Sequence, residues 1–197
     1  MSDETPASVA WNHVFEEKLS YRSTSSFRYV VDRTLYRPRE IIQFCNQCIE
    51  LANGEGLVDY SIIGKAEKVY SLSRVDDISA EFRFEYPGLK EIFQTFRGMI
   101  YSFTRAGLEL HCLEIITGER KCPAAKSWLD NCDEQKLISV LWEVGFIRAL
   151  AVGGIKADVR SGSRYIGAHQ LMGLSLVNIN QFTIHPMFHS ALALKEK

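Results

Sequence analysis

"DEQKLISVLWEVGFIRAL", residues 133–150, holds the change of pattern on which the fold prediction rests. Apolar residues follow helical spacing up to Val144, Asp133 is a favoured residue type for a helix N-cap, and Gly145 is a typical helix stop. Residues 146–150 are then a short apolar run of the kind that forms a buried strand. The stretch therefore predicts a capped helix that leads directly into a strand.

The residues that follow continue the strand pattern. Short apolar runs are separated by Gly153-Gly154 and by the Ser-Gly-Ser of residues 161–163, which is typical of a β-hairpin. A last strand precedes Pro186, where a short terminal helix is expected to begin. The predicted order, in which several helices are followed by a helix ending in Gly-Phe-Ile and then by a hairpin, is that of a winged-helix domain.

Upstream of residue 132 every periodic segment predicts a helix. The clearest is within residues 33–52, "RTLYRPREIIQFCNQCIELA", where Pro38 takes the first helical position and Asn53-Gly54 ends the helix. Further helices are expected at 8–19, 89–100 and 108–116, and residues 20–28 are expected to be a loop. A long helix is expected from near Ser61 to the break at Pro87-Gly88. The apolar residues predicted to form its buried stripe are Val69, Leu72, Val75, Ile78 and Phe82.

The predicted fold class is mainly α: a helical bundle in residues 1–87, then a winged-helix domain with a short β-hairpin in residues 88–197. At 197 residues and 46% hydrophobic, the chain is long enough to bury a real core. No run approaches the ~18 apolar residues of a membrane span, and the first ten residues are polar, without a signal-peptide core. Five cysteines, an odd number, without secretory features predict a cytoplasmic protein with no membrane partner.

Candidate catalytic and metal residues are few. Cys45-x-x-Cys48 is half of a zinc-site spacing, but it lies in mid-helix, and the other three cysteines are too widely spaced to complete it, so buried thiols are favoured. His185 precedes Pro186 and is expected to cap or brace the terminal helix, although His111 and His189 also invite a metal or catalytic reading. No serine or cysteine has a recognisable nucleophile elbow. We therefore expect no metal, no cofactor and no independent enzyme activity.

Charge leaves two functions open for the C-terminal part. The chain as a whole carries −1, but residues 133–197 carry +2, and the basic residues of the hairpin region are Arg148, Lys156, Arg160 and Arg164. Such residues could contact the phosphates of double-stranded DNA without reading its sequence. The preceding helix is poor in the Arg, Asn and Gln side chains that read bases. The alternative is a surface for protein–protein contact or self-assembly.

Five stretches of the sequence carry a family resemblance: "TLYRPREIIQFCNQCIELA", "VYSLSRVDDISAEF", "YPGLKEIFQTF", "LWEVGFI" and, near the end, "FTIHPMFHSAL". Together they resemble the C-terminal portion of bacterial origin-recognition-type AAA+ ATPases, which are P-loop proteins with phage-defence-associated relatives. The resemblance implies that residues 1–87 form a helical lid and residues 88–197 a winged helix. It further implies that Arg39, with Arg37 as second choice, senses the nucleotide phosphate as a sensor-2 arginine. An arginine fork at a helix start fixed by proline suits a phosphate. The other interpretation is that both arginines pair with local acids such as Asp32 or Glu40.

The sequence departs from that family in one decisive motif. No G-x-x-x-x-G-K-[ST] is present, so nothing cradles a β-phosphate or positions magnesium, and the chain is expected not to hydrolyse ATP alone. It is expected to be either a fragment or a separate subunit of a longer assembly. A full-length parent would bind ATP and magnesium. The expected partners are a nucleotide-binding core in cis or in trans, double-stranded DNA, and a second copy in a homo-oligomer.

Overall fold

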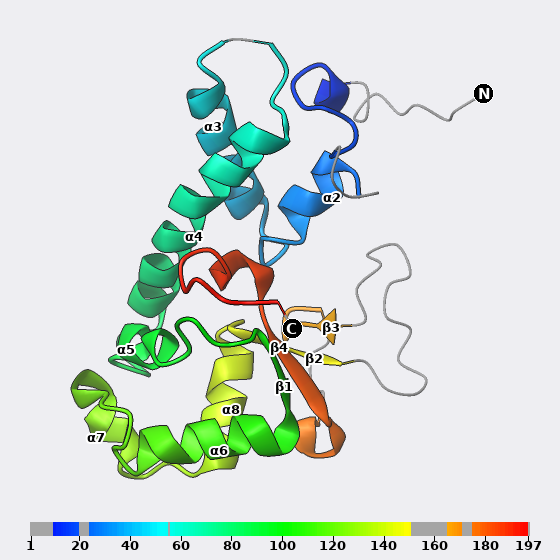
Figure 1. Ribbon diagram of the computed structural model, residues 1–197. Coiled ribbons are helices and arrows are strands. Elements are labelled where there is room, and N and C mark those ends of the chain that lie inside the picture. The colour runs from blue at the N-terminus through cyan, green and yellow to red at the C-terminus, as the bar shows by residue number, and fades with distance from the viewer. Residues whose placement is uncertain (1–9, 20–23, 55, 151–164, 171–174, 197) are drawn as a thin grey trace. The chain divides into compact units, whose positions relative to one another are not determined.

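The computed structural model describes residues 10–19, 24–54, 56–150, 165–170 and 175–196 (Figure 1). They form two compact units, Met1–Tyr70 and Ser71–Lys197. The described chain is a mixed structure, about half helical, with a helical domain near the N-terminus and a four-stranded antiparallel sheet. Within these ranges no helix has both the length and the apolar character needed to cross a membrane. The predicted domain boundary at 87/88 lies in the turn after the long helix and stays a prediction.

The first unit contains α2 (Ser26–Val31), α3 (Pro38–Ala52) and the first half of α4 (Tyr60–Glu81). The predicted α3 is confirmed: Pro38 is at its start, and the helix ends where Asn53 takes a left-handed conformation with φ of 51°. The core of the unit includes Phe44, whose ring stacks on Tyr70 with centroids 4.5 Å apart.

Two predictions for the first 31 residues are wrong. Residues 13–19 are not helical; instead Phe15 forms a β-bridge with Val58, and Phe15 is buried. Residues 24–28 are not only loop, because α2 begins at Ser26 and the Ser25 hydroxyl accepts a hydrogen bond from the Arg28 amide. A serine-rich stretch predicts a loop by composition, but a single serine at an N-cap also starts a helix.

The long helix α4 begins where expected but buries a different face. Val75 and Ile78 are buried as predicted, whereas Val69 and Leu72 are 45% and 58% exposed. The side chains that face inward include three polar or charged ones, those of Glu67, Ser71 and Arg74. The buried residues of the helix are Ile63, Ala66, Glu67, Tyr70, Ser71, Arg74, Val75 and Ile78. The Ser71 hydroxyl donates to the Met187 carbonyl over 2.5 Å and accepts from the Ala191 amide over 2.9 Å. Because apolar residues lie on both sides of the helix, hydrophobicity alone does not identify the buried side.

The helices of the second unit after α4 are short. They are α5 (Leu89–Gln94), α6 (Arg105–Ile116), α7 (Lys126–Leu129) and α8 (Glu134–Glu143). Both signals predicted for α8 are confirmed: the Asp133 carboxylate accepts from the Lys136 amide over 2.7 Å, and Gly145 has φ of 76°. Gly88, before α5, has φ of 81°, and a Cβ there would lie 2.4 Å from the Ala125 nitrogen, so this close approach requires glycine.

The sheet has the strand order β1-β4-β2-β3, and all three pairings are antiparallel. The strands are β1 (Ser102–Thr104), β2 (Ile147–Leu150), β3 (Tyr165–Ile166) and β4 (Gln181–Ile184). β2 and β3 pair antiparallel on either side of the predicted hairpin turns, which lie within residues 151–164 and outside the described residues, and β4 confirms the predicted last strand. The expectation of an all-helical chain up to residue 132 is wrong, because β1 pairs Phe103 with Phe182 in β4. A three-residue strand whose partner lies far along the chain leaves no periodic signal.

An aromatic core joins the helices to this sheet. The Phe93 ring stacks on Phe146 at 4.3 Å between centroids, and Phe188 lies 5.0 Å from Phe146. Phe96 lies 5.2 Å from Phe146 and contacts β1 through Phe103 at 5.8 Å. The core therefore fixes the end of α8, the start of β2 and the C-terminal turn together.

Candidate interaction surfaces

The Arg37-Pro38-Arg39 start of α3 is built around a carboxylate. Both arginines are exposed, and Arg37 is the N-cap residue without a side-chain capping bond. Glu40 is only 3% exposed, and its Oε2 accepts a hydrogen bond from the Leu35 amide over 2.6 Å. The positive end of the helix dipole therefore already has an anion of the chain itself close by.

Behind this start lies a buried charged cluster of three residues that sequence reasoning did not find. Arg33 Nε lies 2.8 Å from Glu67 Oε1, and the Tyr29 hydroxyl donates to Glu67 Oε2 over 2.6 Å. The Arg33 guanidinium also lies 3.3 Å from the centroid of the Tyr29 ring. Burial, more than the nearby charges, raises the pKa of Tyr29 well above its usual range. The cluster links α2 to α4 through Glu67 on the buried side of α4 and Arg33 in the turn after α2, and no local pattern in the sequence pairs these two charges.

The outer face of α8 carries little positive charge. Its exposed residues are Gln135, Lys136, Ser139 and Glu143. Arg105 at the start of α6 lies beside this face, where Nη1 donates to Gln135 Oε1 over 3.2 Å and Nε donates to the Ile179 carbonyl over 2.8 Å. The segment around Val177 and this face enclose a hollow of about 650 Å³ that also holds Glu109 and Glu143. A phosphate backbone would meet Arg105 and the carboxylates of Glu109 and Glu143 in this hollow, with Lys136 on the exposed face of α8 nearby.

Only one of the four predicted DNA-contacting residues lies in the described part of the chain. Arg148 is 7% exposed on β2, in register with Thr183 on β4. Lys156, Arg160 and Arg164 fall within residues 151–164, outside the described residues. The described structure therefore does not bring the four predicted side chains together.

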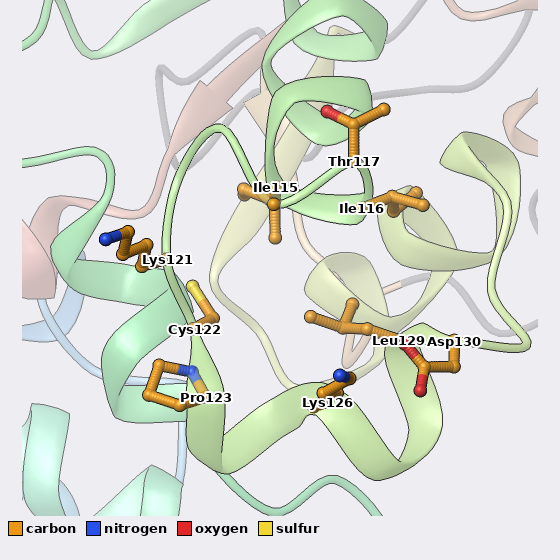
Figure 2. A pocket seen from close by; sticks show the side chains of 10 residues that line it. Ile115, Ile116, Thr117, Lys121, Cys122, Pro123, Lys126, Leu129 and Asp130 are labelled. Carbon is orange, nitrogen blue, oxygen red and sulfur yellow. The ribbon is translucent and has the colours of Figure 1, made fainter.

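A cavity of about 430 Å³ lies between the end of α6, the loop before α7, and α7 itself (Figure 2). Its lining is mixed: Ile115 and Leu129 are among the apolar residues, and Lys121, Lys126 and Asp130 are charged. Burial raises the pKa of the Cys122 thiol in this lining to about 11. The thiol is therefore protonated near neutral pH and is a poor nucleophile.

Burial governs the other thiols, and one imidazole, that of His185, has a structural role. All five cysteines are free, and burial raises the pKa of Cys45 to about 11 and of Cys48 to about 12. Among the residues that the structure describes, no three His, Cys, Asp or Glu side chains are grouped to hold a metal ion. The predicted brace is confirmed, because His185 Nδ1 accepts from the Met187 amide at the start of the 3-10 turn Pro186–Phe188.

Exposed apolar side chains concentrate in the N-terminal part of the described chain, in and between its helices. Ten of the fifteen exposed large apolar residues in the described chain lie before residue 80: Val14, Phe27, Tyr36, Ile42, Ile49, Leu51, Leu57, Tyr60, Val69 and Leu72. Single exposed apolar residues are ordinary on protein surfaces, so it is their number in this part of the chain, rather than any one of them, that makes it a candidate interaction surface.

Comparison with known proteins separates the two parts of the chain. No curated protein and no solved structure matches the sequence, and no link to AAA+ ATPases emerges. One family model matches residues 1–79, which contain α2, α3 and nearly all of α4. The helical part of the chain is thus similar to the FunZ-associated C-terminal helical domain.

Proposed function

We propose that this chain is a non-catalytic protein-association module, in which the N-terminal helical domain supplies the contact surface. The observation that carries the proposal is the concentration of exposed apolar side chains before residue 80. The name of the matching family, a C-terminal helical domain associated with FunZ, agrees with a domain that works beside another part of a protein.

The second unit is proposed to be a winged helix that serves the same assembly. The order β1, α6, α7, α8, β2, β3 supports this, with a short strand before the helices and an antiparallel strand pair after them. The outer face of α8, where Lys136 and Arg105 are offset by Glu109 and Glu143, favours a protein partner over DNA bases. Burial of Arg148 removes one of the four basic residues from a phosphate-contacting surface.

Sequence-independent DNA contact is the second candidate function. It is favoured by Lys156, Arg160 and Arg164, which are accompanied by a single acid, Asp158, in residues 151–164. Three phosphate contacts imply a salt dependence with a log–log slope of about −3 and a dissociation constant of about 10⁻⁴–10⁻⁶ M.

A nucleotide-sensing role for Arg39 or Arg37 is less well supported. It needs ATP, magnesium and a nucleotide-binding core supplied in cis or in trans, and the buried Glu40 carboxylate makes the start of α3 less favourable for a phosphate.

Fluorescence anisotropy with two unrelated labelled duplexes tests the proposed function. At ~50 mM salt, where nonspecific contact is strong, the association module is expected to leave the duplexes unbound. The association proposal would give way to the DNA-contact candidate if the chain bound both duplexes equally and a triple variant, Lys156→Ala, Arg160→Ala, Arg164→Ala, did not bind them.

A further inference from the structure

The outer face of α3 carries two isoleucines that the fold leaves uncovered. Ile42 is 58% exposed and Ile49 is 47% exposed, and they are two helical turns apart on one side of the helix. The exposed Asn46 lies between them. The opposite side, with Phe44 and Cys48, is buried in the core of the first unit.

This apolar face is bounded by one positive and one negative charge. At 100° per residue, Arg39 and Glu50 project on the same flank, about 60° and about 80° from Ile42. Arg39 is at the start of the helix and Glu50 near its end, about 16 Å apart along the axis. Both are exposed, and neither forms an ion pair with another side chain of the described residues.

From this arrangement we infer that α3 pairs with α3 of a second copy of the chain in antiparallel orientation. A two-fold axis near residues 45–46 carries the start of one helix onto the end of the other on the same flank. Ile42 then faces the partner subunit's Ile49, and Arg39 faces the partner subunit's Glu50. A parallel pair would instead carry this flank to opposite sides of the interface, so that neither arginine would face a Glu50. The inference rests on the proposed association function and names its partner.

The expected dimer is weak, because one helix pair covers less area than the roughly 1,000 Å² of a stable interface. A dissociation constant of ~10–1,000 µM is therefore expected for the full chain. The ion pair occurs twice by symmetry, so reversing one charge turns two attractions into two repulsions. The dissociation constant should then rise by at least ~10-fold.

Sedimentation equilibrium of the full chain over a range of concentrations tests this pairing. Arg39→Glu alone and Glu50→Arg alone should each weaken dimerisation, and the double charge swap should restore it. Ile42→Asp should abolish it. Val177→Asp is the matched control, because Val177 is 73% exposed on a turn of the second unit, and it should leave dimerisation unchanged. Far-ultraviolet circular dichroism checks that each variant is folded.

The outcomes separate this inference from the function on which it rests. A dimer that none of the α3 variants weakens would overturn the α3 pairing and keep the association function. A chain that stays monomeric up to ~500 µM, well inside the expected range, would also overturn the pairing. If the double charge swap did not restore dimerisation, the antiparallel register would be wrong. The proposed function itself fails only on duplex binding.

Discussion

Acid should destabilise the second unit through one buried imidazole, that of His111 on α6. The side chain is 3% exposed, its ring centroid lies 4.0 Å from that of Phe96, and Nε2 lies 2.9 Å from the Thr95 hydroxyl. Burial lowers the pKa of His111 from 6.5 to about 4; the positive Arg120 adds to the effect, and Glu114 opposes it. His111 is therefore neutral in the folded protein at pH 7.

The sign of the pH dependence follows from the lowered pKa. The unfolded chain takes up a proton at His111 below about pH 6.5, whereas the folded chain takes it up only near pH 4. Between these values the unfolded state binds more protons, so the free energy of unfolding falls as the pH falls. From the two pKa values the loss is about 2 kcal/mol between pH 7.5 and pH 5, and about 3 kcal/mol once the pH is below 4.

Urea denaturation at pH 7.5 and pH 5.0 measures this loss. Carboxylates also titrate in this range, so the wild type is compared with His111→Gln, which stays neutral at both pH values and can still bond to Thr95. The variant should lose about 2 kcal/mol less than the wild type between the two pH values. His13→Gln, an exposed position in the first unit, is the control and should respond as the wild type does. Equal losses in His111→Gln and wild type would refute the assignment of acid sensitivity to His111.

Three further substitutions test the packing by urea denaturation at pH 7.5. Ser71→Ala leaves two buried backbone groups without their partner and should lower the free energy of unfolding by about 3 kcal/mol. The control, Ser139→Ala at an exposed position, should change it by less than about 0.5 kcal/mol. Equal losses in the two variants would contradict the buried hydrogen bonds of Ser71. Glu67→Gln removes the charge that holds its arginine and tyrosine partners and should cost about 3 kcal/mol, so a neutral result would contradict the cluster. Gly88→Ala should cost more than about 2 kcal/mol through its backbone conformation and close neighbour, while Gly64→Ala inside α4 should stabilise by about 0.5–1 kcal/mol.

Local signals predicted the helices whose ends are set by a few neighbouring residues. Asp133 and Gly145 bound α8, and Pro38 and Asn53 bound α3, because caps and stops depend on backbone geometry within one turn. The strand β1 was missed for the opposite reason. Its structure depends on pairing with residues 181–183, and three residues are too few to show an alternating pattern.

The face of α4 could not be read from hydrophobicity, because its buried side is partly polar. Glu67 and Ser71 face inward since partners from other segments satisfy them there, while Val69 and Leu72 remain exposed. Which polar groups find partners is a property of the folded chain, not of the helix. Because polar residues take part of the buried side of α4, apolar side chains such as Val69 and Leu72 remain on the outside of the helical domain.

The start of α3 shows why the candidate phosphate site was ambiguous in the sequence. A proline at the first helical position, flanked by arginines, suits a helix N-terminus that binds an outside anion. An acid two residues after that proline suits a helix that supplies its own anion, as Glu40 does by accepting from Leu35. Both descriptions fit the same four residues, and only burial distinguishes them. Because Glu40 is buried and Arg39 exposed, the arginine is available at the surface, where the uncovered isoleucines and Glu50 give it a partner in a second copy of the chain.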